Sequence, residues 1–476
     1  MAVLLILAMA IVAVACNSTP STSDGETGFQ TQSKTDTDIV TEKQTGYLDG
    51  VRYDGYEYRI LSSEDEKHFV FCDEDSTSPM SAAVYRANSE VEDVYDISII
   101  TMPLVDNRDM DTVRALTLSD VNTYDATHMH DCSTATLSLE GLFMDIYDVP
   151  NMDPSAPWWP QFSVESLTLN GKMYFIHNFS SYHPAQSTVM MAFNKKIVEQ
   201  FHLENPYDLV RSGDWTLNKL IEMSTTAYKD VNGNGRVDEN DVLGIATGGV
   251  LYCWTEAFGF EFYGKVSSDS AEIEFNADNE KLIGFLEKFY DWTCTRKDGV
   301  LIKMSEDSMK GLEVFAKGDT LFTARDLGNM ITYILATDID YGFLPMPKYD
   351  EMQENYVGAC TGNPMAIPTN LTDYTRAGAI AEAMSYAGYK YLKPAYVDVA
   401  LKDRYSDEDS REMIELAFNN RIISFTYLYS NVGTGIQWRI LYDTVGAKNK
   451  NFASYIDKNA NGEIPTIEKI EEFYSR

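Results

Sequence analysis

The sequence predicts an α/β protein whose sheets are covered by helices on both faces. From about residue 47 onward, apolar stretches typical of strands alternate with stretches of helical periodicity. Hydrophobic residues make up 44% of the 476-residue chain and aromatic residues 12%, which is enough for a large core. We find no internal repeat within this alternation, so the sequence favours a globular α/β fold.

The expected elements follow one another along the chain. Apolar stretches predict strands over residues 57–62, 97–102, 187–194, 319–324, 341–347 and 363–368. Helical periodicity predicts helices over 80–94 and 279–295, and Thr216 and Asp373 are suitable N-caps for two more. The Asn-Gly pair at 170–171 is typical of a tight hairpin turn.

The charge balance excludes some classes of partner. The chain has 38 basic and 73 acidic side chains, a net charge of −35. A surface of this sign repels phosphate backbones and anionic lipid headgroups, so we expect no nucleic-acid partner. We also expect a monomer.

The N-terminus resembles a bacterial lipoprotein signal. Residues 1–15 are apolar and uncharged, and they are too few to cross a ~30 Å hydrocarbon layer. The small residues before Cys16 resemble the lipobox, in which the Cys thiol receives diacylglycerol. An ordinary signal with a chance Cys is the alternative. Because no basic residue precedes the apolar run, we expect the natural start to lie upstream or the sequence to be trimmed.

Residues 16–46 are predicted to be a flexible tether. Ser and Thr dominate the segment after Cys16, and little in it could pack into a core. A lipid on Cys16 would then hold the folded part at the extracellular face of the cell membrane, as in Gram-positive-type bacteria.

The other cysteines and a histidine pair give weak signals. The five cysteines after Cys16 are widely spaced and include no CxxC pair, so neither a disulfide framework nor a zinc site is expected. His128 and His130 could share a strand face as metal ligands, but no third ligand is evident.

Residues 230–241 match a calcium-binding loop. Calcium prefers six to eight oxygen ligands, and a twelve-residue loop can wrap them around one ion. Gly235 stands at the position of the sharp turn. The expected ligands are Asp230, Asn232, Asn234, the carbonyl of Arg236, Asp238 and Asp241. We expect a structural Ca²⁺ here, with an ion-free acidic turn as the alternative.

A second segment, residues 457–468, has the same spacing of oxygen-bearing residues. It contains Pro465 and leads directly into a predicted helix, with Asn461-Gly462 as the turn before it. Calcium is therefore less expected here than at 230–241.

The chain as a whole resembles a known family. The order of VESLTLNGKMYFI, VMMAFNKKIVEQF, SGDWTLNKLIEM, VFAKGDTLFTA and YGFLPMPKYDE along the chain carries the resemblance. With the lipobox and tether, this order is similar to the extracellular solute-binding proteins, family 1, of ABC importers, the maltodextrin-binding type in lipoprotein form. The resemblance covers residues 47–476.

The resemblance implies the two-lobed type II periplasmic-binding-protein fold, with strands that cross between the lobes. The crossings would lie near 183–192 and 358–367. Lobe 1 would comprise 47–185 plus about 368–395, and lobe 2 would comprise 186–367 plus about 396–476.

Candidate ligand contacts lie where loops follow strands, because ligands gather at the carboxyl ends of strands in open α/β sheets. The loop after the first strand supplies Ser63 and Glu64, and the loop Tyr252–Trp254 and the pair Arg325-Asp326 follow later strands. The resemblance adds His130 and Asp131 at a polar ligand position, and His183 and Gln186 at the cleft floor. Aromatic faces combined with planar polar groups suit a sugar.

Several of these residues have a second interpretation. Trp254 is as readily a core residue, and Arg325-Asp326 as readily a surface ion pair. For Trp158 and Trp159, which are flanked by prolines, packing is favoured over ligand stacking.

The sequence favours a binding protein over an enzyme. It contains no G-x-S-x-G, HExxH, P-loop or G-x-G-x-x-G motif in a suitable context. We expect a non-catalytic protein that captures a solute, with oligosaccharide as the implied class, and delivers it to an ABC permease. A secreted carbohydrate-active hydrolase and a surface protein that presents ligand to a membrane sensor are the alternatives.

Overall fold

The computed structural model describes residues 45–476, except for 250, 276–279, 297, 304–308 and 402–406. Lys43–Arg476 forms one compact unit. The predicted signal at 1–15, the predicted lipidation at Cys16 and nearly all of the tether therefore lie outside the described residues. Their structure stays a prediction.

The first sheet brings the ends of its parallel strands to one edge. Its strands, in spatial order, are β12 (Met365–Ala366), β3 (Ala126–His128), β1 (Tyr56–Ser63) and β2 (Ile97–Leu104). β1 pairs in parallel with both neighbours: Ser63 lies opposite Leu104, and Ser62 opposite His128. The loops that follow these three strands consequently start side by side.

The second sheet is mixed. Its strands, in spatial order, are β10 (Tyr341–Leu344), β4 (Val189–Asn194), β9 (Thr320–Asp326), β5 (Leu243–Gly248) and β8 (Val300–Lys303). β5 runs parallel to β8 and β9, whereas β4 runs antiparallel to β9 and β10. Every residue of β4 and β5 is buried, as expected for strands covered on both faces.

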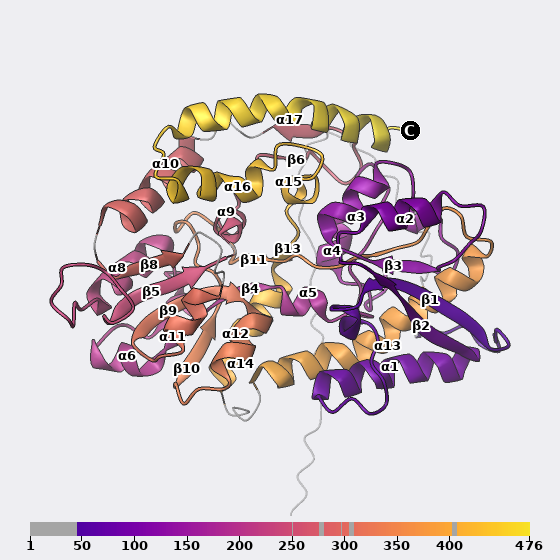
Figure 1. Ribbon diagram of the computed structural model, residues 1–476, viewed down its shortest axis with the longest axis horizontal. Coiled ribbons are helices and arrows are strands. Elements are labelled where there is room, and N and C mark those ends of the chain that lie inside the picture. Colours follow the sequence, from indigo (N-terminus) through magenta and orange to yellow (C-terminus); the bar gives the residue numbers. More distant parts are fainter. Residues whose placement is uncertain (1–44, 250, 276–279, 297, 304–308, 402–406) are drawn as a thin grey trace, which may run out of the picture. The chain divides into compact units, whose positions relative to one another are not determined.

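Helices and short strands surround the two sheets (Figure 1). In the first 167 residues, the helices are α1 (Pro79–Tyr95), α2 (Met110–Thr117), α3 (Asp131–Ser138) and α4 (Gln161–Leu167). Those between β4 and β10 are α6 (Lys195–Gln200), α7 (Pro206–Ser212), α8 (Leu217–Ala227), α9 (Tyr252–Ala257), β6 (Tyr263–Lys265), β7 (Ile273–Phe275), α10 (Glu280–Tyr290), α11 (Lys310–Phe315) and α12 (Leu327–Ile334). The C-terminal ones are α13 (Tyr374–Leu401), α14 (Glu408–Asn419), α15 (Phe425–Leu428), α16 (Ile436–Leu441) and α17 (Phe452–Tyr474). Single turns lie at Lys67–Phe69 (η1), Ile146–Asp148 (η2), Asp291–Thr295 (η3) and Tyr442–Gly446 (η4).

Three short segments lie between the two sheets: α5 (His183–Gln186), β11 (Gly358–Ala359) and β13 (Arg421–Ile422). We call them the crossing segments (Figure 1). α5 leads directly into β4 of the second sheet, and β11 is followed by β12 of the first. β11 and β13 pair in parallel. We call the elements around the first sheet the first lobe and those around the second sheet the second lobe.

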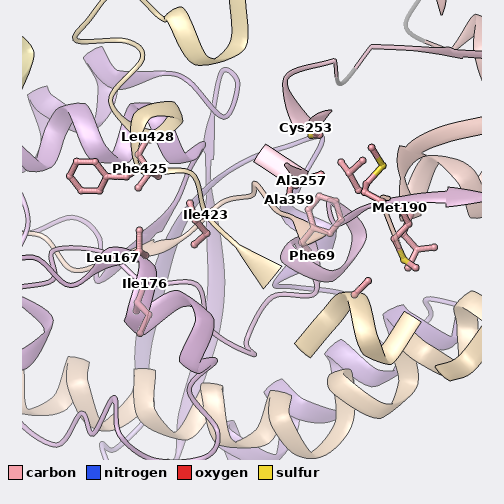
Figure 2. Packing of buried hydrophobic residues seen from close by; sticks show 14 of the residues in the cluster. Phe69, Leu167, Ile176, Met190, Cys253, Ala257, Ala359, Ile423, Phe425 and Leu428 are labelled. Atoms are coloured by element: carbon pink, nitrogen blue, oxygen red, sulfur yellow. The ribbon is translucent and has the colours of Figure 1, made fainter. Parts of the chain in front are cut away.

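Apolar side chains pack around the crossing segments (Figure 2). Ala359 of β11 and Ile423, just after β13, lie among buried side chains of both lobes, such as Phe69 and Met190. One hydrophobic cluster therefore runs through this region from one lobe to the other.

The predicted hairpin turn and the two predicted helix N-caps are confirmed. Asn170 and Gly171 have φ values of 50° and 69° at the tip of the hairpin. The Thr216 side chain accepts a hydrogen bond from Lys219 N at the start of α8, and that of Asp373 accepts one from Arg376 N at the start of α13.

The tryptophan pair packs inside the protein, as the flanking prolines indicated. Trp158 and Trp159 are both buried, and each indole N–H donates to the carboxylate of Glu382 on α13. These hydrogen bonds satisfy the polar atoms of two large buried side chains.

Two long helices lie in the C-terminal part of the chain. α13 packs against α1 of the first lobe and continues to α14, which packs against β10 of the second. α17 runs unbroken through 457–468, so the predicted turn at Asn461-Gly462 is wrong and that segment forms no loop to enclose an ion. Phe452 of α17 contacts Tyr290, and Phe473 contacts Tyr174. α17 thus contacts residues of both predicted lobes, and the lobe bounds stay a prediction.

Two further observations concern cysteines and membrane spans. The five cysteines within the described part of the chain are free thiols, four of them buried. None of the helices described has both the length and the apolar character that crossing a membrane requires.

Candidate functional site

Polar side chains from three strand-end loops meet beside the first sheet. Glu66 lies in the loop after β1 and Asn107 in the loop after β2, and the parallel register brings these loops together. The Glu66 carboxylate accepts hydrogen bonds from Asn107 Nδ2 at 2.8 Å and from Asn363 Nδ2, just before β12, at 2.6 Å. This carboxylate thus joins the loops of the first lobe to the segment after β11.

His130, at the end of β3, lies beside Arg108 from the loop after β2. Arg108 Nη2 donates to His130 Nε2 at 2.7 Å, so this ring nitrogen carries no proton. Burial lowers the pKa of His130 to about 4, with the Asp131 carboxylate opposing the shift and the Arg108 charge adding to it. The imidazole is therefore a neutral hydrogen-bonding group at physiological pH.

Two tyrosines link this polar group to the second lobe. Tyr252, on the short helix α9 that follows β5, stacks on Tyr427 of α15 with ring centroids 4.9 Å apart and planes 16° from parallel. The Tyr427 ring lies 6.3 Å from His130. Cys132 at the start of α3 donates its thiol hydrogen to the Tyr427 carbonyl at 3.2 Å. We call Glu66, Arg108, His130, Tyr252 and Tyr427 the crossing cluster.

The predicted residues of α5 contact both lobes. The His183 ring stacks on Phe69 of the first lobe at 4.2 Å, with the planes only 4° apart. Burial lowers the pKa of His183. Gln186 presses against Gly328 in the first turn of α12, where a Cβ atom would overlap the glutamine side chain. α5 is thus fixed by close packing on each side.

Arg325 and Asp326 lie at the carboxyl end of β9, where the strand-end rule placed them. Their side chains form an ion pair at 3.3 Å and are almost buried. Asp326 also accepts a hydrogen bond from Asn329 N, at 3.0 Å, and so caps α12. The surface ion pair that the sequence offered as an alternative is wrong in its exposure, because the pair is almost buried. A role of Arg325 and Asp326 in ligand binding stays a prediction.

Trp254 is a correction to the predicted site. Its side chain is 1% exposed and packs among Phe258, Phe289 and Trp292, with ring centroids 5.5–6.3 Å away. The predicted role as an exposed stacking face is wrong, and the alternative of a core residue is correct. Tyr252, two residues earlier, is the aromatic residue of α9 that stacks on Tyr427 in the crossing cluster.

Asp131, Glu64 and Ser63 also differ from expectation. Asp131 is fully buried: Oδ1 lies 2.8 Å from His177 Nε2, and Oδ2 accepts a hydrogen bond from Gly362 N at 2.6 Å. Oδ2 is thus held by a backbone hydrogen bond, and Oδ1 lies beside the His177 ring. Glu64 is exposed to solvent and pairs with Lys67 at 2.5 Å. Ser63 is buried at the end of β1.

Sequence reasoning missed three members of the crossing cluster. Glu66 and Arg108 had a usable signal, since both follow parallel strands of the first sheet and the same rule that pointed to His130 applies to them. Tyr427 had none, because α15 follows the last crossing segment and reaches the site only through the tertiary fold.

A separate cavity of about 870 Å³ opens next to α5. None of the ten predicted ligand residues lines it; its walls come from α4, α5, α13, α14 and β13. We call it the hinge pocket. Tyr182, Pro184 and Ala185 line it, whereas their neighbours His183 and Gln186 do not, so the segment around α5 separates the pocket from the contacts described above.

The predicted calcium loop has a regular backbone arrangement. Asp230 accepts hydrogen bonds from Gly233 N at 2.7 Å and Gly235 N at 2.8 Å, and Asp241 accepts one from Asp238 N at 3.1 Å. The φ of Gly235 is 67°, the left-handed conformation that its position requires. Within the described residues, no group of three or more His, Cys, Asp or Glu side chains is close enough to hold a metal ion. Calcium binding by this loop stays a prediction.

Comparison with known proteins identifies the fold. No protein-family model and no curated protein matches the sequence. UgpB from Mycobacterium tuberculosis, solved in complex with glycerophosphocholine, is similar over 87% of this chain and 99% of its own, with a TM-score of 0.56 and 15% identity. The fold is that of the two-lobed periplasmic binding proteins. The fold class predicted from the sequence is therefore confirmed.

Two further structures extend the likeness. MalE from Bdellovibrio bacteriovorus, bound to maltotriose, matches over 86% of this chain and 100% of its own, with a TM-score of 0.52 and 12% identity. The ABC substrate-binding protein Lmo0181 from Listeria monocytogenes, in complex with cycloalternan, matches over 89% and 98%, with a TM-score of 0.50 and 12% identity.

Proposed function

We propose that this protein captures a carbohydrate solute between its two lobes and delivers it to the membrane permease of an ABC importer, without catalysing a reaction. The fold supports the capture step. The ligands of the similar structures, among them maltotriose and cycloalternan, support the carbohydrate class. The sequence contains none of the catalytic motifs considered above in a suitable context, which agrees with a binding role.

The observation that carries the proposal is the composition of the crossing cluster. Carboxylate, guanidinium and neutral imidazole groups of the first lobe lie near the stacked rings of Tyr252 and Tyr427. Sugars are bound by this combination, because ring C–H groups pack on aromatic faces while hydroxyls pair with planar polar groups.

Capture would work through a shift of population between an open and a closed arrangement of the lobes. In the structure, the rings of Tyr252 and His130 both lie beside Tyr427, and both residues are partly buried. A solute that contacts both sides favours closure only through contacts that are absent when the lobes separate.

The test is a binding screen of the full chain against maltooligosaccharides, cyclic glucans, polyols and amino acids. A ligand at 100 times its Kd stabilises the folded state by ~2.7 kcal/mol, which a thermal shift detects. Tyr252→Ala should then weaken binding of the hit about tenfold by loss of stacking. The exposed Trp438→Ala is the matched aromatic control and should leave the affinity unchanged. No hit among carbohydrates, or an unaltered affinity in Tyr252→Ala, would refute the assignment.

We also propose a structural Ca²⁺ at 230–241, held by Asp230, Asn232, Asn234, the Arg236 carbonyl, Asp238 and Asp241. The backbone hydrogen bonds to Asp230 and Asp241 support it, since they fold the chain around these carboxylates. The ion would fasten the loop that precedes β5.

We further propose that Cys16 carries a lipid that anchors the protein at the extracellular face of the membrane. The apolar run before Cys16 and the Ser/Thr-rich tether after it support this proposal. Cys16→Ser, expressed in the native host, should move the protein from the membrane fraction to the soluble fraction. Retention of the variant in the membrane fraction would show that the anchor lies elsewhere.

A further inference from the structure

The hinge pocket has the size and walls of a small-molecule site. Its volume of about 870 Å³ falls within the ~300–1,000 Å³ typical of ligand pockets. Aromatic rings and prolines form much of its wall. The rings are those of Trp159, Phe162, Phe179, Tyr182, Tyr389, Tyr396 and Phe418.

Arg421 of β13 lines the pocket without an acidic partner. Its guanidinium lies 4.3 Å from the ring centroid of Phe162 and 4.8 Å from that of Phe418, and Nε donates to the Phe418 carbonyl at 3.0 Å. Among the residues that the structure describes, no carboxylate forms an ion pair with Arg421. Its remaining N–H groups are therefore available for a planar anion.

Lys393 of α13 is a second pocket cation without an acidic partner. Its ammonium lies 4.5 Å from the ring centroid of Tyr389 and 5.5 Å from that of Phe179. Partial burial lowers the pKa of Lys393, and the nearby charge of Arg421 lowers it further. No ion pair to Lys393 is found within the described part of the chain. Both cations therefore line the pocket, where an anion could pair with them.

The other charged groups of the pocket do not neutralise these two cations. Asp398 is bound to Arg411 at 3.2 Å, and Lys390 is bound to Glu90 of α1 at 2.9 Å. Glu415 is exposed to solvent. In a chain with a net charge of −35, two unpaired cations at one aromatic pocket are a local reversal of the overall charge.

An unsatisfied polar group completes the lining. Tyr396 is 4% exposed, and its hydroxyl has no hydrogen-bond partner within the described structure. A buried hydroxyl without a partner costs free energy, so a ligand or a water that supplies an acceptor would stabilise the pocket.

We propose that the hinge pocket is a second binding site, which takes a small organic anion with a flat apolar body, of the aromatic carboxylate class. The carboxylate lies between Arg421 and Lys393, where a guanidinium can donate two parallel hydrogen bonds. The ring system packs against the aromatic walls. This site is separate from the crossing cluster and does not depend on which solute that cluster binds.

The test uses the full chain and two probes of equal shape, 2-naphthoate and its neutral analogue 2-naphthalenemethanol, in isothermal titration calorimetry. The wild type should bind naphthoate about tenfold more tightly than the alcohol, because only the carboxylate pairs with the cations. Arg421→Gln and Lys393→Gln should each reduce that preference, Arg421→Gln the more strongly. Arg439→Gln, an exposed arginine paired with Asp443 outside the pocket, is the matched control and should change nothing.

Two results would overturn the proposal. One is equal affinity for the acid and the alcohol, or a preference that persists in both Arg421→Gln and Lys393→Gln. The other is loss of naphthoate binding in Tyr252→Ala, which would place the probe at the crossing cluster. Because the side chain of Lys393 is largely accessible to solvent, Lys393→Gln should fold normally, so the proposal stays testable if Arg421→Gln does not fold.

Discussion

The first lobe reaches the crossing segments through hydrogen-bonded polar side chains, whereas the second lobe does so through an aromatic core. In the first lobe, Asp131 pairs with His177, and Glu66 joins two asparagines. In the second lobe, Trp254 and its aromatic neighbours form the layer beneath Tyr252.

The difference indicates how each lobe holds its part of the candidate site. Hydrogen bonds and ion pairs are directional, so the polar groups of the first lobe fix the orientation of His130 and Glu66. Aromatic packing is less directional but buries a large area, so it supplies stability and holds Tyr252 in place. We therefore expect variants of the second lobe to affect stability most, and variants of the first lobe to affect geometry.

The largest effect is expected for Trp254→Ala in the aromatic core. Removal of this buried ring should lower the free energy of unfolding by about 3–5 kcal/mol, measured by urea denaturation. Tyr252→Ala, two residues away and partly exposed, should cost about 1 kcal/mol. Equal losses of unfolding free energy in the two variants would contradict the distinction between Trp254 as a core residue and Tyr252 as a site residue.

The next prediction tests the buried polar groups of the first lobe. Asp131→Asn removes the charge that faces His177, and it leaves a buried donor without its acceptor, so the free energy of unfolding should fall by about 1–3 kcal/mol. Asp148→Asn, an exposed acid of the same lobe, should change it by less than about 0.5 kcal/mol. If chemical denaturation finds the two variants alike, the buried pair contributes nothing to the first lobe.

Calcium should stabilise only one of the two twelve-residue segments. At millimolar Ca²⁺, well above its Kd, the wild type should gain about 1–3 kcal/mol relative to a chelator buffer. Asp230→Ala should lose this gain. Asp457→Ala should keep it, because residue 457 lies within the continuous helix α17. A gain that survives in Asp230→Ala would remove the proposed ion from 230–241.

An effect of pH is expected at a partly buried acid of the second lobe. Burial raises the pKa of Glu261 to about 7, while Thr426 N donates to its carboxylate at 3.1 Å. The folded state therefore binds this proton up to about pH 7, and the unfolded state only up to about pH 4.3. The contribution of Glu261 to stability is present below pH 4.3 and is lost as the pH rises through 7.

Glu261→Gln carries no titrating group, so the stability of the wild type relative to it should fall by about 3 kcal/mol between pH 4.5 and pH 8. Thermal unfolding at several pH values measures the difference. A difference that is constant with pH would show that Glu261 titrates normally.

Most of the fold could be predicted from the sequence because strands and caps have local signals. β2 and β4 lie where apolar runs placed them, and Thr216 and Asp373 cap helices as expected. The error at Pro465 has a tertiary cause. Proline inside a helix costs ~3 kcal/mol, yet burial of residues such as Ile456 and Ile470 on one helical face offsets it.

The candidate site was predictable only in part. Strand-end loops pointed to His130, and the same rule could have given Glu66 and Arg108. The choice between Tyr252 and Trp254 could not be made from the sequence. Residues two apart on a helix differ by ~200° in direction, and only the packing of α9 decides which one faces the core. Tyr427 reaches the site through tertiary folding alone.

Helix α17 has a mechanical consequence for lobe motion. Its first residue, Phe452, contacts Tyr290, and its last turn contacts Tyr174 and the side chain of Asn170. A helix is nearly inextensible, and the 21 residue steps from Phe452 to Phe473 span ~32 Å at ~1.5 Å per residue. α17 therefore acts as a strut of fixed length between two anchors. Opening must either pivot about these anchors or bend the strut at Pro465, where a backbone hydrogen bond is already missing.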